Sequence, residues 1–275
     1  MPYKSGQEPE NLNKQLNRAL RHFSGIGPKS MQVLKDRQTE DWEQIKKQKN
    51  RIPFSEKKIN SLLEEIQVHE NALQQNDIGF FIDSFKPKDY WRILKTFYHK
   101  ASFFDLETSG LGKEHKITVL ICLHKNRLYT YVQGQNLDDF LNLLDEIDLL
   151  ISFNGSSFDV PKVLDSFHIP ELLCPHLDLR WVCFHFGYKG GLKKIEQSLD
   201  IHRPQEYADM DGEEAVYLWQ LWQKTKKQEF LQKLITYCSL DVVSLKYLTE
   251  ILLFKRPETD MSSLFQSYKR NSGID

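Results

Sequence analysis

Two acidic residues spaced two positions apart are the first candidates for chemistry in this chain. Asp105 and Glu107 follow the apolar pair Phe103 and Phe104, and the run 103–108 has the composition of a strand that ends in acids. Successive side chains of a strand point to opposite faces, so both acids are expected on one face. Such a pair is either catalytic or, like most acids at strand ends, simply solvated.

A third acid follows a turn of small residues. An apolar run over 149–153 leads into Asn154, Gly155 and two serines, and Asp159 then stands at the start of a helical stretch. The turn therefore places another carboxylate close to the end of a strand. The alternative is local, because Asp is favoured near helix N-termini for capping and for its interaction with the helix dipole.

A tyrosine and a fourth acid share one helix face. Tyr237 and Asp241 lie four residues apart inside a pattern that predicts a helix over 229–252. Residues at this spacing point to the same side, so the phenol and the carboxylate can enter a single site. A surface acid beside a half-buried tyrosine is the alternative.

Together these segments supply four carboxylates and one phenol. Four acids in one site require cations, because like charges a few ångströms apart do not all stay ionised without them. Oxygen ligands suit Mg²⁺ or Mn²⁺. Two such ions about 4 Å apart activate a water and stabilise both oxygens of a phosphoryl transfer.

The order D-x-E at 105–107, N-x-x-x-F-D at 154–159 and Y-x-x-x-D at 237–241 resembles the DEDD superfamily of 3′-5′ exonucleases, over residues 100–253. Thr236 and Tyr237 match the tyrosine subgroup of that superfamily. The resemblance implies a ribonuclease-H-like fold. It also implies that the four acids ligate two Mg²⁺ or Mn²⁺ ions and that Tyr237 positions the attacking water.

Residues 190–196 and 200–203 further resemble the YprB-like branch of ribonuclease-H-fold proteins. Within this stretch, Lys193 is a candidate contact to nucleic acid. Asn154 either hydrogen-bonds a nucleotide or braces its turn. Asp178 falls where the superfamily often carries an acid, so it is a structural candidate or a residue that supports the metal ligands.

Short apolar runs alternate with helical patterns after residue 100. Strands are expected over 101–106, 117–124, 127–132 and 149–153, with helices near 137–147 and 229–252. A turn at Lys125 and Asn126 joins two strands into a hairpin. The predicted fold class is α/β, with a ribonuclease-H-like mixed sheet flanked by helices and preceded by a small all-helical domain.

The first part of the chain predicts helices. Apolar residues recur at helical spacing at Leu12, Leu16, Ala19, Leu20 and Phe23, and further helices are expected after Pro28 and over 56–73, capped by Ser55. The expected divisions are a helical module over 1–76, an aromatic connector over 77–99, an exonuclease domain over 100–255 and a loose C-terminal tail over 256–275.

The run 22–30 resembles the hairpin of a helix-hairpin-helix DNA-binding motif. Gly25 and Gly27 allow positive φ and a close backbone approach, and Lys29 adds charge next to amides that can face a phosphate. Residues 1–100 hold 18 Lys or Arg against 13 Asp or Glu, which suits a polyanion. The alternative is a packing unit that binds no nucleic acid.

Composition argues against several other classes of protein. The longest strand-like apolar stretch is 117–123, so no membrane span is expected, and a cytoplasmic protein is indicated. Four cysteines are too few for a disulfide framework. Two of them, with neighbouring histidines, offer zinc ligands at 174, 176, 183 and 185, but the spacing matches no common structural site.

The leading hypothesis is a metal-dependent 3′-5′ exonuclease that acts on nucleic acid, with single-stranded 3′ ends as substrate and DNA somewhat favoured over RNA. One alternative is a non-catalytic nucleic-acid-binding or scaffold protein with the same fold. Another is a structure-specific endonuclease that uses the same site.

Overall fold

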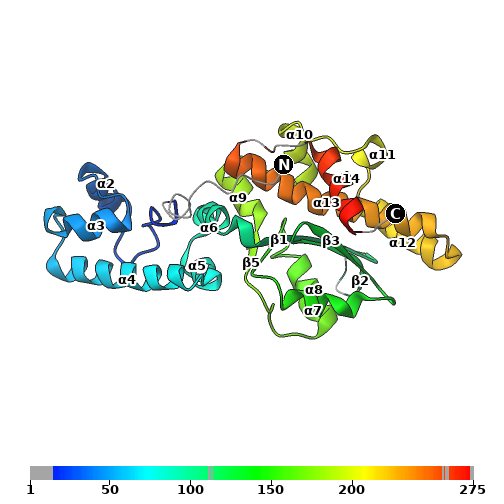
Figure 1. The fold of residues 1–275 in the computed structure, drawn as a ribbon, viewed down its shortest axis with the longest axis horizontal. Coiled ribbons are helices and arrows are strands. Elements are labelled where there is room, and N and C mark those ends of the chain that lie inside the picture. The colour runs from blue at the N-terminus through cyan, green and yellow to red at the C-terminus, as the bar shows by residue number, and fades with distance from the viewer. Residues whose placement is uncertain (1–14, 111, 113, 256, 258–259, 273–275) are drawn as a thin grey trace. The chain divides into compact units, whose positions relative to one another are not determined.

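The computed structural model describes residues 15–110, 112, 114–255, 257 and 260–272. The chain divides into two compact units, Met1–His99 and Lys100–Asp275, and each is described by itself (Figure 1). The first is helical and the second contains a sheet, so the predicted fold class is confirmed. Within the described residues, no helix combines the length and hydropathy needed to cross a bilayer.

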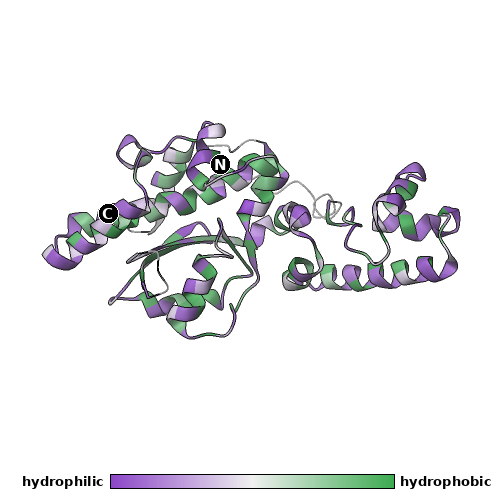
Figure 2. Ribbon diagram, turned by 180° about the vertical axis from the view of Figure 1, so that it is seen from behind, coloured by the Kyte–Doolittle hydropathy of each residue, from purple (hydrophilic) through white to green (hydrophobic). Residues whose placement is uncertain are grey.

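The N-terminal unit is built on the long helix α4. Its elements are α2 (Pro28–Asp36), α3 (Trp42–Gln48), η1 (Lys49–Arg51), α4 (Glu56–Gln74), α5 (Ile78–Ser84), η2 (Pro87–Asp89) and α6 (Tyr90–Thr96), followed by η3 (Tyr98–Lys100). Apolar and polar residues alternate along α4 (Figure 2), with Ile59, Leu62 and Ile66 buried on one side. Ser55 caps this helix as predicted, because its side chain accepts from the Lys58 amide.

The helix expected over 12–23 is wrong for the described residues, since the backbone after Leu16 forms successive turns. The carbonyls of Asn17 and Ala19 accept hydrogen bonds from the backbone amide and the indole of Trp42, each at 3.1 Å. Those carbonyls would otherwise serve a continuing helix. Leu12 lies outside the described residues. The other predicted apolar positions are buried, and Ala19, Leu20 and Phe23 lie outside any helix.

The segment 77–99, predicted as a connector, belongs to the same compact unit. Asp77 caps α5 by accepting from the Phe80 amide at 2.9 Å. Phe81 and Phe97 are almost fully buried, so the aromatic residues of this segment supply core to the N-terminal unit rather than linking two bodies.

The C-terminal unit has one mixed sheet with strand order β3-β2-β1-β4-β5. The strands are β1 (Ala101–Thr108), β2 (Ile117–His124), β3 (Arg127–Val132), β4 (Leu149–Ser152) and β5 (His176–Asp178). The first three are antiparallel, whereas β4 and β5 run parallel to β1. Lys125 and Asn126 form the predicted hairpin turn with positive φ.

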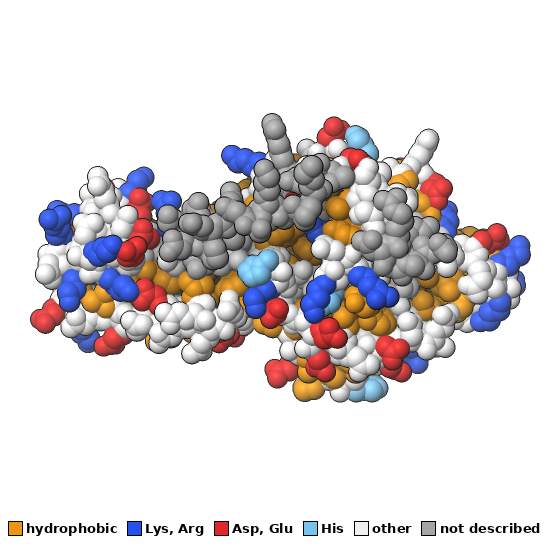
Figure 3. Space-filling model, in the orientation of Figure 1, with side chains coloured by type: hydrophobic (Ala, Val, Ile, Leu, Met, Phe, Trp, Pro, Cys, Tyr) orange, Lys and Arg blue, Asp and Glu red, His pale blue; other side chains and the backbone are white. Residues whose placement is uncertain are grey.

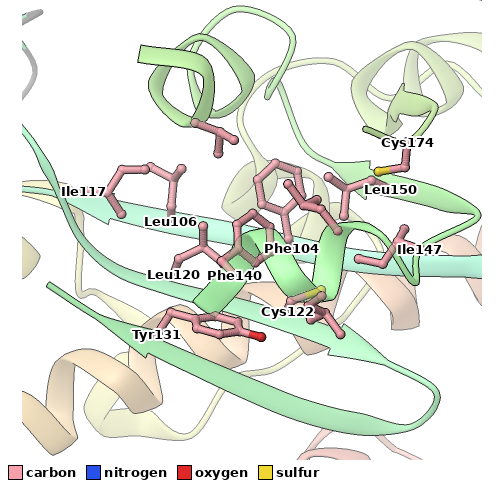
Figure 4. Close-up of a cluster of buried hydrophobic side chains, with 13 residues drawn as sticks. Phe104, Leu106, Ile117, Leu120, Cys122, Tyr131, Phe140, Ile147, Leu150 and Cys174 are labelled. Carbon is pink, nitrogen blue, oxygen red and sulfur yellow. The ribbon is translucent and has the colours of Figure 1, made fainter. Parts of the chain in front are cut away.

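Helices cover both faces of this sheet (Figure 1). They are η4 (Leu137–Asp139), α7 (Phe140–Leu144), α8 (Asp159–Phe167), α9 (Leu179–His185), α10 (Leu192–Ser198), α11 (Gln205–Ala208), α12 (Gly212–Thr225), α13 (Gln228–Phe254) and α14 (Met261–Ser272). On the face with α7 and α8, Phe104 and Leu106 of β1 pack with Phe140 (Figure 4). The opposite face of β1 contacts α13.

The loose tail predicted from residue 256 is wrong for its second half, because α14 packs on β3 and α13. Met261, Phe265 and Tyr268 are buried. Their spacing of four and three residues makes an apolar stripe. A stripe on one helix needs a partner surface, and here β3 and α13 supply it.

Candidate functional site

Strand β1 turns two acids toward α13. Phe104 and Leu106 alternate with Asp105 and Glu107 and are buried in the opposite layer, so the two carboxylates share the face that α13 covers. Cys238 of α13 confirms this contact, because its thiol lies 3.4 Å from the Asp105 carboxylate and 3.5 Å from the Asp105 carbonyl. The predicted pairing of these acids on one face is therefore observed.

Asp159 is the first residue of α8 and is 5% exposed. The turn before it is tight. A Cβ atom on Gly155 would lie 1.9 Å from Ser152 Oγ and 2.8 Å from Ser152 Cβ, so glycine is required where the turn passes the end of β4. The backbones of Asp159 and Leu106 interact favourably with the Asp159 carboxylate and oppose part of the rise that burial causes in its pKa.

Helix α13 contributes Tyr237, Cys238 and Asp241, all of them buried. Tyr237 and Asp241 share one helix face, as their spacing predicts. Burial, followed by the charges of Asp241, Glu107 and Asp105, raises the pKa of the Tyr237 phenol far above its ordinary value. The phenol therefore stays protonated and can donate a hydrogen bond.

The carboxylates perturb one another strongly. Burial raises the pKa of Asp105 well above its ordinary value, and the charges of Asp241, Asp159 and Glu107 raise it further. Burial likewise raises the pKa of Glu107, together with the charges of Asp241 and Asp159. For Asp159, burial raises the pKa to about 7. The structure thus brings the four predicted acids from β1, α8 and α13 into one cluster.

This cluster suits a divalent cation. Ligand atoms of Asp105, Glu107 and Cys238 lie within 4.8 Å of one another. A cation would relieve the repulsion that raises the carboxylate pKa values, and a set dominated by oxygen donors favours Mg²⁺ or Mn²⁺. Burial, with the charge of Asp105, raises the pKa of the Cys238 thiol well above its ordinary value, so the sulfur is a hydrogen-bond donor rather than a thiolate ligand.

Two cations of the chain partly offset the negative charge. Lys193 Nζ lies 5.2 Å from the centre of the Tyr237 ring, and its charge opposes the raised pKa of Glu107. Arg203 donates to Asp241 at 2.5 Å, and this pairing opposes the rise that burial causes in the Asp241 pKa. Lys193 was predicted as a nucleic-acid contact, and its position beside the site keeps that prediction open.

Sequence reasoning missed the partners of Asp241. Arg203 also binds Glu196 through two hydrogen bonds of 2.6 Å and 2.9 Å, and Ser244 donates to the same carboxylate. These side chains are almost inaccessible, so Asp241 is held by a buried ion-pair network. Part of this network could have been expected from the sequence, because Glu196 and Arg203 belong to the stretch that resembles the YprB-like branch.

Asp178 braces the turn that carries Asn154. Its carboxylate accepts from the backbone amides of Asn154 at 2.8 Å and Ser156 at 3.3 Å, and it caps α9 through the Arg180 amide. The Asn154 side-chain oxygen accepts from Arg180 at 2.5 Å, and the residue has φ of 62°. Asp178 is therefore structural, and Asn154 contributes to the turn through its backbone.

In the N-terminal unit, the hairpin that resembles a DNA-binding motif is formed only in part. Gly25 has a φ of 70°, as predicted. Gly27 instead has a φ of −91° and precedes α2, which begins at Pro28, and a regular helix before the hairpin is absent over 17–27. Lys29 is exposed.

Acidic side chains lie close to this hairpin. The Ser24 amide donates to the Glu65 carboxylate at 3.1 Å. On the face drawn in Figure 3, Lys and Arg side chains of this unit lie among Asp and Glu side chains. The hairpin therefore offers a basic residue without a continuous basic surface in that view.

The cysteines and histidines considered for zinc do not form a site within the described residues. Cys174 and Cys183 are free and buried. His176 Nε2 lies 2.8 Å from Ser152 Oγ, so this histidine links β5 to β4. The grouped donors that the described residues contain are those around Asp105.

A family model, RNase_H_2, described as RNase_H superfamily, matches residues 102–253. A search of curated proteins found no match. Solved structures with similarity to this chain include the family B DNA polymerase from the hyperthermophilic archaeon Pyrobaculum calidifontis, at 13% sequence identity and a TM-score of 0.39. That similarity covers 63% of this chain and 29% of the polymerase chain.

Proposed function

Because this chain belongs to the RNase H superfamily, we propose that it is a metal-dependent nuclease that removes nucleotides from 3′ ends. One observation carries the proposal: Asp105, Glu107, Asp159 and Asp241 converge from three elements beside Tyr237, and their pKa values are raised together. A structural acid is usually paired or solvated, whereas Asp105, Glu107 and Asp159 face other acids. Asp241 is paired with Arg203 and adds its charge to this group.

The four carboxylates would hold two Mg²⁺ or Mn²⁺ ions, which supply an activated water and charge stabilisation at the scissile phosphate. Tyr237, with its protonated phenol, donates a hydrogen bond to the attacking water or to a phosphate oxygen and so orients the reacting atoms. Lys193 lies beside the Tyr237 ring and adds positive charge for the phosphate. Arg203 holds one oxygen of Asp241 and leaves the other for a ligand.

The substrate is proposed to be a single-stranded 3′ end, with DNA favoured over RNA. The excess of Lys and Arg over Asp and Glu in residues 1–100 supports an interaction of the N-terminal unit with a polyanion. Gly25, Gly27 and Lys29 are exposed and could meet a phosphate through the backbone and one ammonium. Contacts of this type are independent of base sequence.

The test uses single strands of DNA and RNA labelled at either end, incubated with Mg²⁺, Mn²⁺ or EDTA. We expect a metal-dependent ladder that shortens the strand from its 3′ end. Asp105→Ala should abolish the ladder, and Tyr237→Phe should slow it while leaving metal binding intact. Asp165→Asn, an exposed acid on α8, is the matched control.

Other outcomes would select the alternative functions. Cleavage of a circular single strand would replace the exonuclease proposal with an endonuclease, because a circle has no end. Strand binding without cleavage in either metal would favour a nucleic-acid-binding or scaffold role. Shortening from the 5′ end would refute the proposed polarity.

A further inference from the structure

Residues 180–194, called here the aromatic-basic segment, differ in charge from the rest of their unit. The segment contains four Lys or Arg residues and no Asp or Glu, whereas residues 101–275 as a whole hold 19 basic and 25 acidic residues. It begins in α9 and ends in α10. A local basic stretch in an acidic unit suits a polyanionic ligand.

The same segment exposes large aromatic side chains. Trp181 is 43% exposed and Phe184 is 54% exposed, and their spacing of three residues puts them on one side of α9. The other side of this helix packs into the unit through Val182 and Cys183, which are fully buried. Packing of α9 therefore does not account for the two exposed rings, and Phe186 adds a third, 38% exposed.

Cationic groups lie beside these rings. Lys189 Nζ is 5.3 Å from the centre of the Phe184 ring. Arg180 is exposed and directly precedes Trp181. An aromatic face with a neighbouring ammonium or guanidinium can stack a base while the cation meets the adjacent phosphate.

Both ends of the segment are tied to the candidate site. At its start, Arg180 donates to the side chain of Asn154, in the turn that leads to Asp159. At its end, Lys193 lies 5.2 Å from the Tyr237 ring. A strand that follows the exposed side of the segment would therefore lie close to the carboxylates.

We propose that the aromatic-basic segment is a binding track for single-stranded nucleic acid that leads to the carboxylate cluster. Trp181 and Phe184 stack on bases, and Arg180 and Lys189 contact phosphates. This inference rests on the proposed function for its substrate class. It adds specific stacking residues that would select unpaired strands, because the bases of a duplex already stack on one another.

The first experiment measures binding of the full chain to fluorescein-labelled oligothymidylate and oligouridylate of about twelve nucleotides, a length in the range that single-strand sites cover. EDTA prevents metal-dependent cleavage. We expect Trp181→Ala and Phe184→Ala each to weaken binding about tenfold, in line with the loss of one stacked base. The DNA and RNA arms show whether the track distinguishes the sugar.

Matched variants distinguish the loss of ring stacking from a general loss of folded structure. Tyr217→Ala removes an aromatic ring of α12 that is 58% exposed, and it should leave binding unchanged. Trp181→Phe and Phe184→Tyr keep a ring and should restore most of the affinity. Equal binding by the alanine variants and the parent chain would overturn the inference, and so would equal losses in Tyr217→Ala.

A small substrate distinguishes this inference from the proposed function. Bis(p-nitrophenyl) phosphate is a phosphodiester too short to reach the track. The Trp181→Ala/Phe184→Ala variant should raise the KM for oligonucleotides far more than it changes hydrolysis of this small substrate, and Tyr217→Ala should change neither. If the parent chain cleaves neither substrate, the proposed function fails. The track is then judged by binding alone, and a parent chain that binds no single strand would refute it.

Discussion

Each of the two units buries ionisable groups. The pKa values of the acids in the C-terminal unit are raised, whereas those of the histidines in the N-terminal unit are lowered. In the C-terminal unit, Asp105, Glu107, Asp159 and Asp241 share a small region, and each raises the pKa of others in the set or has its own pKa raised by them. In the N-terminal unit, His22 and His69 lie with ring centroids 4.6 Å apart among aromatic side chains. Burial lowers the pKa of His22 to about 3, with a further contribution from His69.

The histidine pair is explained by packing. The His22 ring lies 4.1 Å from Phe23 and 4.3 Å from Phe85, measured between ring centroids. His69 Nδ1 lies 2.8 Å from the Glu65 carbonyl, and both nitrogens of His22 are buried without a partner among the described residues. Neutral imidazoles in an aromatic core hold the unit together without creating a site for an ion.

A shifted pKa alone therefore does not identify a functional site. Burial is the largest cause of the pKa shifts of His22 and Asp105. What distinguishes the carboxylate cluster is that charges of one sign converge from separate elements, an arrangement that a bound cation would stabilise.

Asp159→Asn should lower nuclease activity by about 10³-fold or more, since a member of the catalytic set is lost. The same substitution should raise the free energy of unfolding in EDTA by about 1–3 kcal/mol, because it removes a buried charge from a group of like charges. Activity assays and chemical denaturation check both. Asp165→Asn on α8 should change neither quantity.

Mg²⁺ or Mn²⁺ should stabilise the C-terminal unit and leave the N-terminal unit unchanged. At a concentration 100 times the dissociation constant, the expected gain in unfolding free energy is about 2.7 kcal/mol. Hydrogen exchange resolves the two units in one experiment. Asp241→Asn should reduce the gain, and equal protection of α4 and α13 by the metal would contradict the assignment of the site.

The two units should respond to pH with opposite signs in EDTA. The folded pKa of Asp159 is about 7, above its ordinary value of 3.8, so its stabilising contribution is complete below about pH 4 and is lost as pH rises to 7. The folded pKa of His22 is about 3, below 6.5, so the N-terminal unit loses stability as pH falls through that range.

Hydrogen exchange at several pH values between 4 and 6.5 measures these slopes for α13 and α4 separately. Saturating Mg²⁺ should flatten or reverse the slope of the C-terminal unit, because metal binding requires deprotonated carboxylates. Parallel slopes in the two units without metal would show that the carboxylates are not coupled as the geometry implies.

The smallest effect is expected for His22→Phe. It replaces a ring with two unpaired buried nitrogens by an apolar ring of similar size, so the unfolding free energy should rise by about 1 kcal/mol. The acid-side loss of stability in the N-terminal unit should also become shallower. Thermal denaturation at pH 5 and pH 7 tests both expectations, with the 80% exposed His202 replaced by Phe as the control.

Much of the C-terminal unit follows from local sequence patterns. The period-two alternation around Asp105 and Glu107 predicts both the strand and the face its acids occupy, and the four-residue spacing of Tyr237 and Asp241 places them on one side of α13. The small turn before Asp159 predicts the start of α8. These features depend on backbone geometry within a few residues, so local sequence patterns are sufficient to predict them.

The long-range partners of these residues depend on how the whole chain packs. Arg203 meets Asp241 across 38 positions, and the Cys238 thiol meets Asp105 across 133. The Trp42 indole donates a hydrogen bond to the Ala19 carbonyl, and the backbone there forms turns where a helix was predicted. Periodicity specifies which face of an element is apolar, but it carries no information on which distant surface will cover that face or satisfy its polar groups. That choice depends on packing of the whole unit.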